Sequence, residues 1–333
     1  MTPAEEHRNK IVALFLLCLT LLGSGSVPIF LRYLLKAETD GGLGLDIWVV
    51  NALRYSSAPV FWLPFVLMRM RRGKSASDGS LLIHGTHLRS GVWKAAIIPT
   101  VFNLVTQTSW GAVGKYADAN VIGFASKLAF PFTVLYSFLL FPAERRLART
   151  SSFWIGALGS LVGLVLLSAE KFAGSGTGGT TMLGYLLLVL MAISWGAYSV
   201  SVKKQMSGYS SILSFWVIST YTTIGLLFLM FVFGDLVTFR VMDIKAWAVL
   251  IASSFIGVTF WHVMYYRALK GVGAVVSDGV LMVSPFLTVA GSAFVLGETL
   301  TPLQAVGGSI LVGGGILLVI AHGRITKEEQ ANF

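Results

Sequence analysis

The chain has 333 residues, of which 55% are hydrophobic and only 12% are charged. Soluble globular proteins carry about 25% charged residues, so this composition excludes a soluble domain and predicts a polytopic membrane protein. A net charge of +10 would suggest nucleic acid in a soluble protein, but in a membrane protein basic loops beside lipid headgroups explain it.

Ten apolar stretches are long enough to cross a bilayer, and each must be helical there because no water satisfies the backbone. In chain order the predicted spans are 11–35, 47–68, 92–114, 119–141, 152–169, 182–203, 211–233, 246–266, 272–296 and 303–321. A Gly/Ser/Thr-rich linker, 171–181, divides them into two groups of five. We therefore predict an all-α integral membrane fold with one repeat at 11–170 and a second at 182–321.

The distribution of basic residues predicts the orientation. Most of the Lys and Arg residues fall in loops and tails on the N-terminal side of the membrane, so both tails, 1–10 and 322–333, are expected in the cytoplasm. Because each group has an odd number of spans, the second group enters the membrane from the opposite side. The two repeats are thus inverted, which is a common plan of secondary carriers.

The fourth and ninth spans resemble each other. A shift of 154 residues aligns Pro131 with Pro285 and Glu144 with Glu298 without a gap. The two glutamates end their spans at opposite membrane surfaces, as an inverted pair should. This similarity supports the division into two repeats.

A weaker similarity links the first and sixth spans. A shift of 171 residues aligns Gly25 with Gly196 and Arg32 with Lys203. Arg32 and Lys203 both lie near span ends, so we expect their long side chains to snorkel to the interface.

The C-terminal residues resemble an EamA domain of the drug/metabolite transporter superfamily, through YYRALKGVGAVVSDGVLMVSPFLTVAGSAFVLGETLTPLQAVGGSILVGGGILLV. The first half resembles it less closely, through Ala52-Leu53-Arg54-Tyr55 and the Pro131 to Glu144 block. The resemblance covers about residues 11–321. It implies a ten-helix carrier with a central cavity lined mainly by the third, fourth, eighth and ninth helices. Similar proteins move amino acids, other metabolites, nucleotide sugars or drugs.

Two ionisable residues lie deep in predicted spans, Lys127 in the fourth and Asp278 in the ninth. Each shares a helix face with the proline of its span, Pro131 or Pro285. Charges inside the membrane are expensive and mark function by default, so we predict a substrate or proton-coupling site. The two could pair across a cavity or bind the carboxylate and amine of a zwitterion. The alternatives are a structural partner role for Asp278 and a snorkelling Lys127.

Polar residues also follow one face of the second and third spans. Arg54 cannot shed its charge and needs an anionic or carbonyl partner, and the resemblance favours a structural or gating role for it. Asn103, Gln107 and Trp110, together with Thr106, form a stripe that predicts a cavity lining, or else hydrogen bonds between helices.

Aromatic residues of the eighth span form a further candidate site. Trp261 and His262 could stack an aromatic or cationic substrate, although an interfacial aromatic belt is the alternative. For His262 a hydrogen-bonded packing role is favoured over a proton relay. Pro28, Pro131 and Pro285 interrupt spans and are predicted to act as hinges.

Glycines of the fifth and tenth spans are predicted to allow close packing of these two helices, with a homodimer face as a second use. They are Gly156, Gly159, Gly163, Gly307, Gly308, Gly313, Gly314 and Gly315.

We predict a carrier in the inner or plasma membrane that exports a small, amino-acid-like metabolite, with proton or counter-substrate coupling. The alternative is a transport-inactive sensor or scaffold with the same fold. No HExxH-type metal motif and no GxxxxGK[ST] loop occurs in the sequence, so neither an enzyme nor a primary pump is expected. The expected partners are the substrate and the lipid bilayer, without cofactor, metal or nucleic acid.

Overall fold

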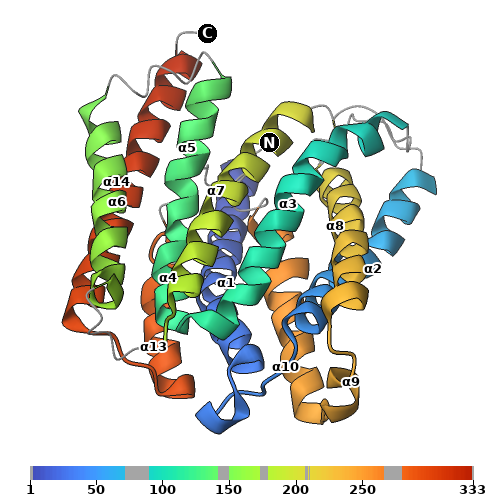
Figure 1. Cartoon of the computed structure of the whole chain (residues 1–333). Helices are drawn as coiled ribbons and strands as arrows, with labels where there is room; N and C mark the ends of the chain where they lie inside the picture. The colour runs from blue at the N-terminus through green and yellow to red at the C-terminus, as the bar shows by residue number, and fades with distance from the viewer. Residues whose placement is uncertain are drawn as a thin grey trace.

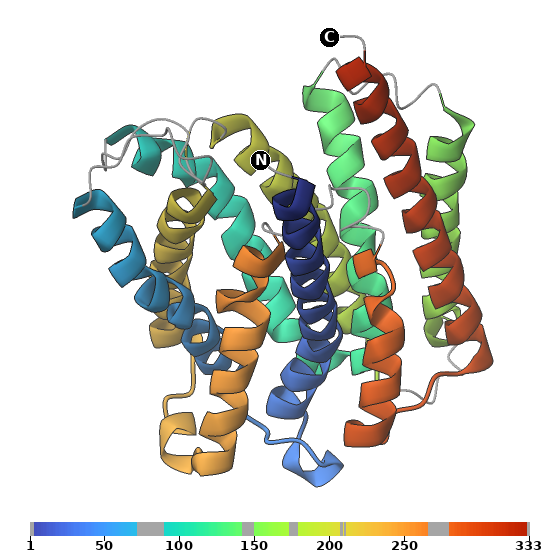
Figure 2. The same ribbon diagram turned by 180° about the vertical axis from the view of Figure 1, so that it is seen from behind.

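The computed structural model of the chain is a bundle of α-helices (Figures 1 and 2). It describes residues 3–71, 90–141, 150–172, 179–206, 209, 211–265 and 280–331. Within these ranges the regular elements are all helical.

The described helices follow the predicted spans closely. Those of the first half are α1 (Pro3–Leu35), η1 (Glu38–Asp40), α2 (Ile47–Arg71), α3 (Ser90–Tyr116), α4 (Ala119–Ala125), η2 (Ser126–Leu128), α5 (Ala129–Leu140) and α6 (Ser151–Phe172). Those of the second half are α7 (Met182–Gln205), α8 (Ser211–Phe233), α9 (Thr238–Val241), α10 (Ile244–Ser254), the π-helical turn η4 (Phe255–Thr259), α13 (Ser284–Leu296) and α14 (Pro302–Ala331).

Seven of the helical segments in the described part of the chain are long and apolar enough to cross a membrane. The helices α2 and α3 are not among the seven, although their 25 and 27 residues reach about 38–40 Å. Their polar residues, such as Arg54 and Asn103, lower the hydropathy. The described part of the ninth span is the shorter apolar helix α13.

Large apolar side chains face outward around the bundle. Phe294 of α13 is 92% exposed, and Phe231 of α8 is 68% exposed. A perimeter of this kind matches a hydrocarbon environment. The start of α1 and the end of α14 lie toward the same end of the bundle (Figures 1 and 2).

The closest helix pairs each join one helix from the first half to one from the second. α14 packs along α6, α3 along α7, α2 along α8, and α1 along α13. Figure 1 shows α6 and α14 at one edge and α2 and α8 at the other. The two halves are therefore interleaved.

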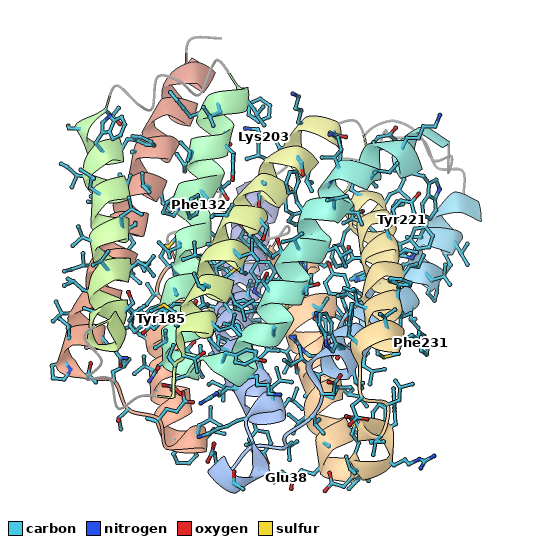
Figure 3. The ribbon with its side chains drawn as sticks, in the orientation of Figure 1. Glu38, Phe132, Tyr185, Lys203, Tyr221 and Phe231 are labelled. Atoms are coloured by element: carbon cyan, nitrogen blue, oxygen red, sulfur yellow. The ribbon has the colours of Figure 1, made fainter. Side chains whose placement is uncertain are left out.

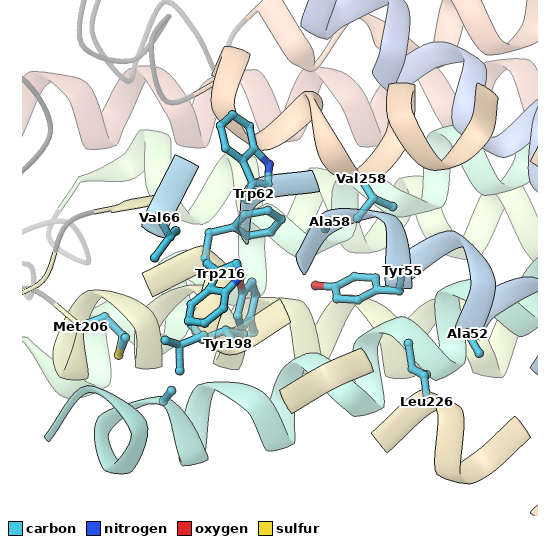
Figure 4. Packing of buried hydrophobic residues seen from close by; sticks show 14 of the residues in the cluster. Ala52, Tyr55, Ala58, Trp62, Val66, Tyr198, Met206, Trp216, Leu226 and Val258 are labelled. Carbon is cyan, nitrogen blue, oxygen red and sulfur yellow. The ribbon is translucent and has the colours of Figure 1, made fainter. Parts of the chain in front are cut away.

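The largest apolar core lies where α2, α3, α7 and α8 meet. Figure 4 shows Tyr55 and Trp62 of α2 facing Tyr198 of α7 and Trp216 of α8. This packing fixes the polar faces of α2 and α3 against the second half of the chain.

The predicted close packing of the fifth and tenth helices is confirmed. A Cβ atom at Gly163 of α6 would lie 2.6 Å from the Gly307 carbonyl oxygen, and one at Gly314 would lie 2.6 Å from the Gly156 oxygen. Gly308 instead faces Phe124 of α4, and a Cβ at Gly313 would meet no atom within 4 Å. The two helices thus touch through one glycine face each.

The predicted prolines divide into two kinds. Pro131 follows the 3-10 turn η2 near the start of α5, and Pro285 occupies the first turn of α13 after a turn at Met282. Pro28 lies inside α1, which continues through it to Leu35. Breaks thus accompany Pro131 and Pro285 but not Pro28, and the hinge role of the three stays a prediction.

Candidate functional site

One group of buried polar side chains, which we call the polar centre, lies on α2 and α3. Its members are Asn51, Arg54, Asn103, Thr106 and Gln107, all at most 7% exposed.

Asn103 connects three helices. Its amide donates to the Tyr55 hydroxyl of α2 at 2.7 Å and to the Thr222 hydroxyl of α8 at 2.8 Å. Its carbonyl oxygen accepts a bond from Gln107 at 3.3 Å. Thr106 completes the stripe by donating to Ser194 of α7 at 2.9 Å.

Asn51 extends this network along α2. Its amide donates to the Gln107 carbonyl oxygen at 2.8 Å, and Gly111 leaves room for it, since a Cβ there would lie 2.4 Å from the Asn51 side chain. The stripe predicted on the third helix therefore makes hydrogen bonds to its neighbours, with members of both halves.

Arg54 lies one turn from Asn51 and is 2% exposed. Its Nε donates to the Ser253 hydroxyl of α10. Among the described residues this is its hydrogen-bond partner, and no carboxylate pairs with it. Across from it is the π-helical turn, where a Cβ at Gly257 would lie 3.3 Å from Nη2 of Arg54. A guanidinium has five N–H donors, so most of this one is left without a bond to described protein groups.

The candidate residues Trp261 and His262 both pack against neighbouring helices. Trp261 donates to the Ser24 hydroxyl of α1 at 2.7 Å and stacks on Tyr265. His262 stacks on Phe215 of α8 at 4.4 Å between ring centroids, with Nδ1 3.0 Å from the Val258 carbonyl oxygen. The two side chains thus point toward different helices.

Trp110 and Lys127 are partly buried. Trp110 packs against two apolar clusters, one around Val113 and Phe124 and one around Leu31. Lys127 lies in the turn η2 that breaks the fourth span. Asp278 lies outside the described residues, so its predicted pairing with Lys127 remains a prediction.

The snorkelling predicted for Arg32 is wrong. Its side chain is 6% exposed and pairs with Asp118 at 2.9 Å and with Glu298 at 3.0 Å. It also donates to the carbonyl oxygens of Gly114 and Lys115 at 3.3 and 3.2 Å. By contrast Lys203 is exposed at the end of α7, with Nζ 4.6 Å from the Phe141 ring centroid (Figure 3).

We call Arg32, Asp118 and Glu298 the ion cluster. It lies at the end of the bundle opposite the chain termini, where α1 and α13 end. Gly297 has a φ of 65°, the left-handed conformation that ends α13 and precedes Glu298. The sequence signal was available, because the predicted topology puts Arg32 and Glu298 at the same membrane surface.

Further bonds surround the cluster. Oε2 of Glu298 accepts from the Ala119 backbone N–H at 2.7 Å, and Thr180 bonds to both the backbone and the carboxylate of Asp118. Asn120 donates to the Thr299 carbonyl oxygen at 3.3 Å. This end of the bundle is therefore tied together by segments from both halves.

Comparison with known protein families identifies the domain that forms the second half of the chain. Residues 182–321 match the family described as EamA-like transporter family. Residues 182–321 form an EamA domain. It extends from α7 to α14, and it confirms the resemblance drawn from the C-terminal residues. With the apolar helices, this match supports an integral multi-pass membrane protein whose second half is related to EamA-like transporters.

Other comparisons concern the fold. No curated protein matches the chain. A solved structure titled "Crystal structure of protein" is 17% identical, with a TM-score of 0.55, and the match covers 92% of this chain and 96% of that one. At this identity the likeness shows a shared fold, and it extends over both halves.

Proposed function

We propose that the protein is a secondary carrier that moves a small, amino-acid-like metabolite out of the cell by alternating access. It has ten spans in two inverted repeats, 11–170 and 182–321, joined by the linker 171–181. The membrane is the inner or plasma membrane, with both termini in the cytoplasm. Its substrate site is the polar centre, where the first half meets the EamA domain.

Two helix crossings support the repeats. A Cβ at Gly25 of α1 would lie 2.8 Å from Leu287 of α13, and a Cβ at Gly196 of α7 would lie 2.8 Å from Thr133 of α5. The shift of 154 residues that aligns Pro131 with Pro285 also aligns Thr133 with Leu287. Equivalent glycines therefore allow equivalent crossings, α1 on α13 and α7 on α5.

The observation that carries the substrate assignment is the buried Arg54. A guanidinium deprived of water is costly unless an anion joins it, and leaving such a charge without its partner costs about 3–5 kcal/mol. Ser253 supplies only a neutral acceptor. A substrate carboxylate would use the free donors in a bidentate pair. Lys127 and Asp278 are proposed as further substrate or coupling groups, with Asp278 receiving an amine or a proton.

Flux of a panel of radiolabelled amino acids in proteoliposomes, with and without a pH gradient, tests this proposal. Arg54→Lys keeps the charge but loses the planar fork, so KM for a transported amino acid should rise about tenfold or more. Transport of the decarboxylated analogue should not change. Ser253→Ala is the matched control, since it removes the neighbouring hydroxyl alone and should have a smaller effect.

Asp278→Asn should abolish flux that depends on the amine or on the pH gradient. Unchanged flux in the folded variant would remove Asp278 from the mechanism. If no member of the panel moves, a transport-inactive sensor or scaffold becomes the better account. If Arg54→Lys weakens the amine analogue equally, the carboxylate assignment fails while the carrier stands.

A further inference from the structure

The ion cluster has one more negative than positive charge. Arg32 supplies one positive group and Asp118 and Glu298 supply two carboxylates, with side chains 6%, 13% and 7% exposed. Two further described cations lie close in the chain, Lys36 one turn after Arg32 and the exposed Lys115, whose backbone oxygen accepts from Arg32. Among the described residues the ion pairs of Asp118 and Glu298 are both with Arg32. An excess charge in a buried place is unfavourable, and binding a proton is the simplest way to remove it.

Within the cluster Glu298 is the group placed to take that proton. Burial raises its pKa, and the nearby charge of Asp118 raises it further, while Arg32 and the Ala119 N–H oppose the rise. Asp118 also receives hydrogen bonds from Arg32 and from the Thr180 hydroxyl.

The cluster also joins the two halves of the chain at one end of the bundle. It joins α1 and the start of α4 to the connection between α13 and α14, which is a junction between the first half and the EamA domain. The space is tight, since a Cβ at Gly179 would lie 2.6 Å from Asp118 and 2.7 Å from Arg32. For this end to open, the bonds of Glu298 to Arg32 and Ala119 must break.

We propose that the Arg32–Asp118–Glu298 cluster is a proton-binding latch: Glu298 takes up a proton as this end of the bundle closes and releases it as the end opens. The proposal rests on the alternating access proposed above. In the open form water reaches Glu298, which loses both the influences that raise its pKa and the bonds to Arg32 and Ala119 that lower it. Because the raising influences are the larger in the closed form, opening lowers the pKa of Glu298. The closed form therefore binds the proton more tightly, and by linkage acid favours closure.

A buried thiol beside the latch reports its state. Ser292 is 0% exposed, and its carbonyl oxygen accepts the Glu298 backbone N–H at 3.3 Å. Ser292→Cys is close to isosteric, and Cys18→Ser removes the one native thiol. The purified full chain in nanodiscs is labelled with a hydrophilic maleimide, without substrate, between about pH 5 and pH 8. Each rate is divided by that of denatured protein at the same pH, which removes the titration of the thiol.

The normalised labelling rate should rise with pH, because deprotonation favours the open form. Each pKa unit of difference between the two forms changes their ratio by up to about tenfold. In Glu298→Gln the side chain is neutral at every pH, as protonated Glu298 is, so this variant should favour the closed form. Its labelling rate should therefore be low and independent of pH. Asp118→Asn removes a neighbouring negative charge, so its midpoint should move to lower pH. Lys115→Gln, an exposed neighbour, should leave the midpoint where it is.

A flat profile in the parent protein would overturn the proposal, and so would a pH response that survives Glu298→Gln. If Glu298→Gln does not fold, the Asp118→Asn variant tests the proposal instead. A shift of its labelling midpoint to lower pH supports proton binding by Glu298, and an unchanged midpoint contradicts it, since loss of a purely structural bond would not move the midpoint. Labelling needs no substrate. If labelling depends on pH but no substrate is transported, the proton-binding latch is supported and the carrier function is rejected. If substrate is transported but labelling does not depend on pH, the carrier function is supported and the latch is rejected.

Discussion

Arg32 shows how far the environment of one side chain can depart from its position in the sequence. It is near the end of an apolar span, where a long cation usually reaches water. Its two carboxylate partners are 86 and 266 residues away in the chain. They converge on it because α1, the start of α4 and the end of α13 meet at one end of the bundle.

Asn103 and Arg54 are both buried, but they differ in how well they are satisfied. Asn103 bonds through both amide donors and its carbonyl oxygen, which makes it a joint between α2, α3 and α8. Arg54 has a single hydroxyl partner among the described residues. The Asn103 arrangement holds three helices together around the polar centre, and the Arg54 arrangement suits the substrate role proposed for it.

Thr222→Val tests the joint at Asn103. The change keeps the shape of the side chain but removes an acceptor of the Asn103 amide, so it should destabilise the protein by about 1–2 kcal/mol. The midpoint of thermal unfolding in detergent measures it. Thr220→Val is the control, because the Thr220 hydroxyl bonds to the Trp216 oxygen of its own helix. If both variants lower the midpoint equally, the hydrogen bond between Asn103 and Thr222 makes no measurable contribution to stability.

At the scale of elements, α6 and α14 approach through glycine faces that the sequence pattern predicted. The pattern did not distinguish Gly313 from Gly314, which are adjacent in the chain but lie on different faces of α14. Only the rotation of the helix about its axis separates them, and packing sets that rotation.

Gly314→Ala should therefore destabilise the protein, because its Cβ would lie 2.6 Å from two backbone atoms of α6. Overpacking of this kind costs about 1–3 kcal/mol. Gly313→Ala should be neutral or stabilising by up to about 1 kcal/mol, since it meets no atom and favours the helix. Thermal unfolding in detergent compares the two. A larger loss from Gly313→Ala would mean that this face packs against something else, such as a second copy.

At the scale of the whole molecule, the positions of the two chain ends relative to the ion cluster define the two ends of the bundle. Both chain ends lie at one end of the bundle, and the ion cluster lies at the other. The predicted orientation makes the first end cytoplasmic and the second external.

Peptide tags on the N- and C-termini should both be protected from antibody in intact cells and both be accessible after permeabilisation. A thiol introduced at exposed Glu38, which lies at the lower end in Figure 3, should show the opposite pattern under a membrane-impermeant reagent. Tags found on different sides would remove the inverted repeat and the proposed external position of the latch.

The sequence by itself determined the membrane class, the helical positions of the described spans and the EamA resemblance of the second half, because hydropathy and local motifs are properties of neighbouring residues. The positions of Pro131 and Pro285 at helix breaks were readable for the same reason. Tertiary structure alone decided that the halves interleave, that Arg32 is buried between two carboxylates and that Arg54 faces a hydroxyl. These depend on contacts between residues far apart in the chain, which helix packing fixes and no local pattern records.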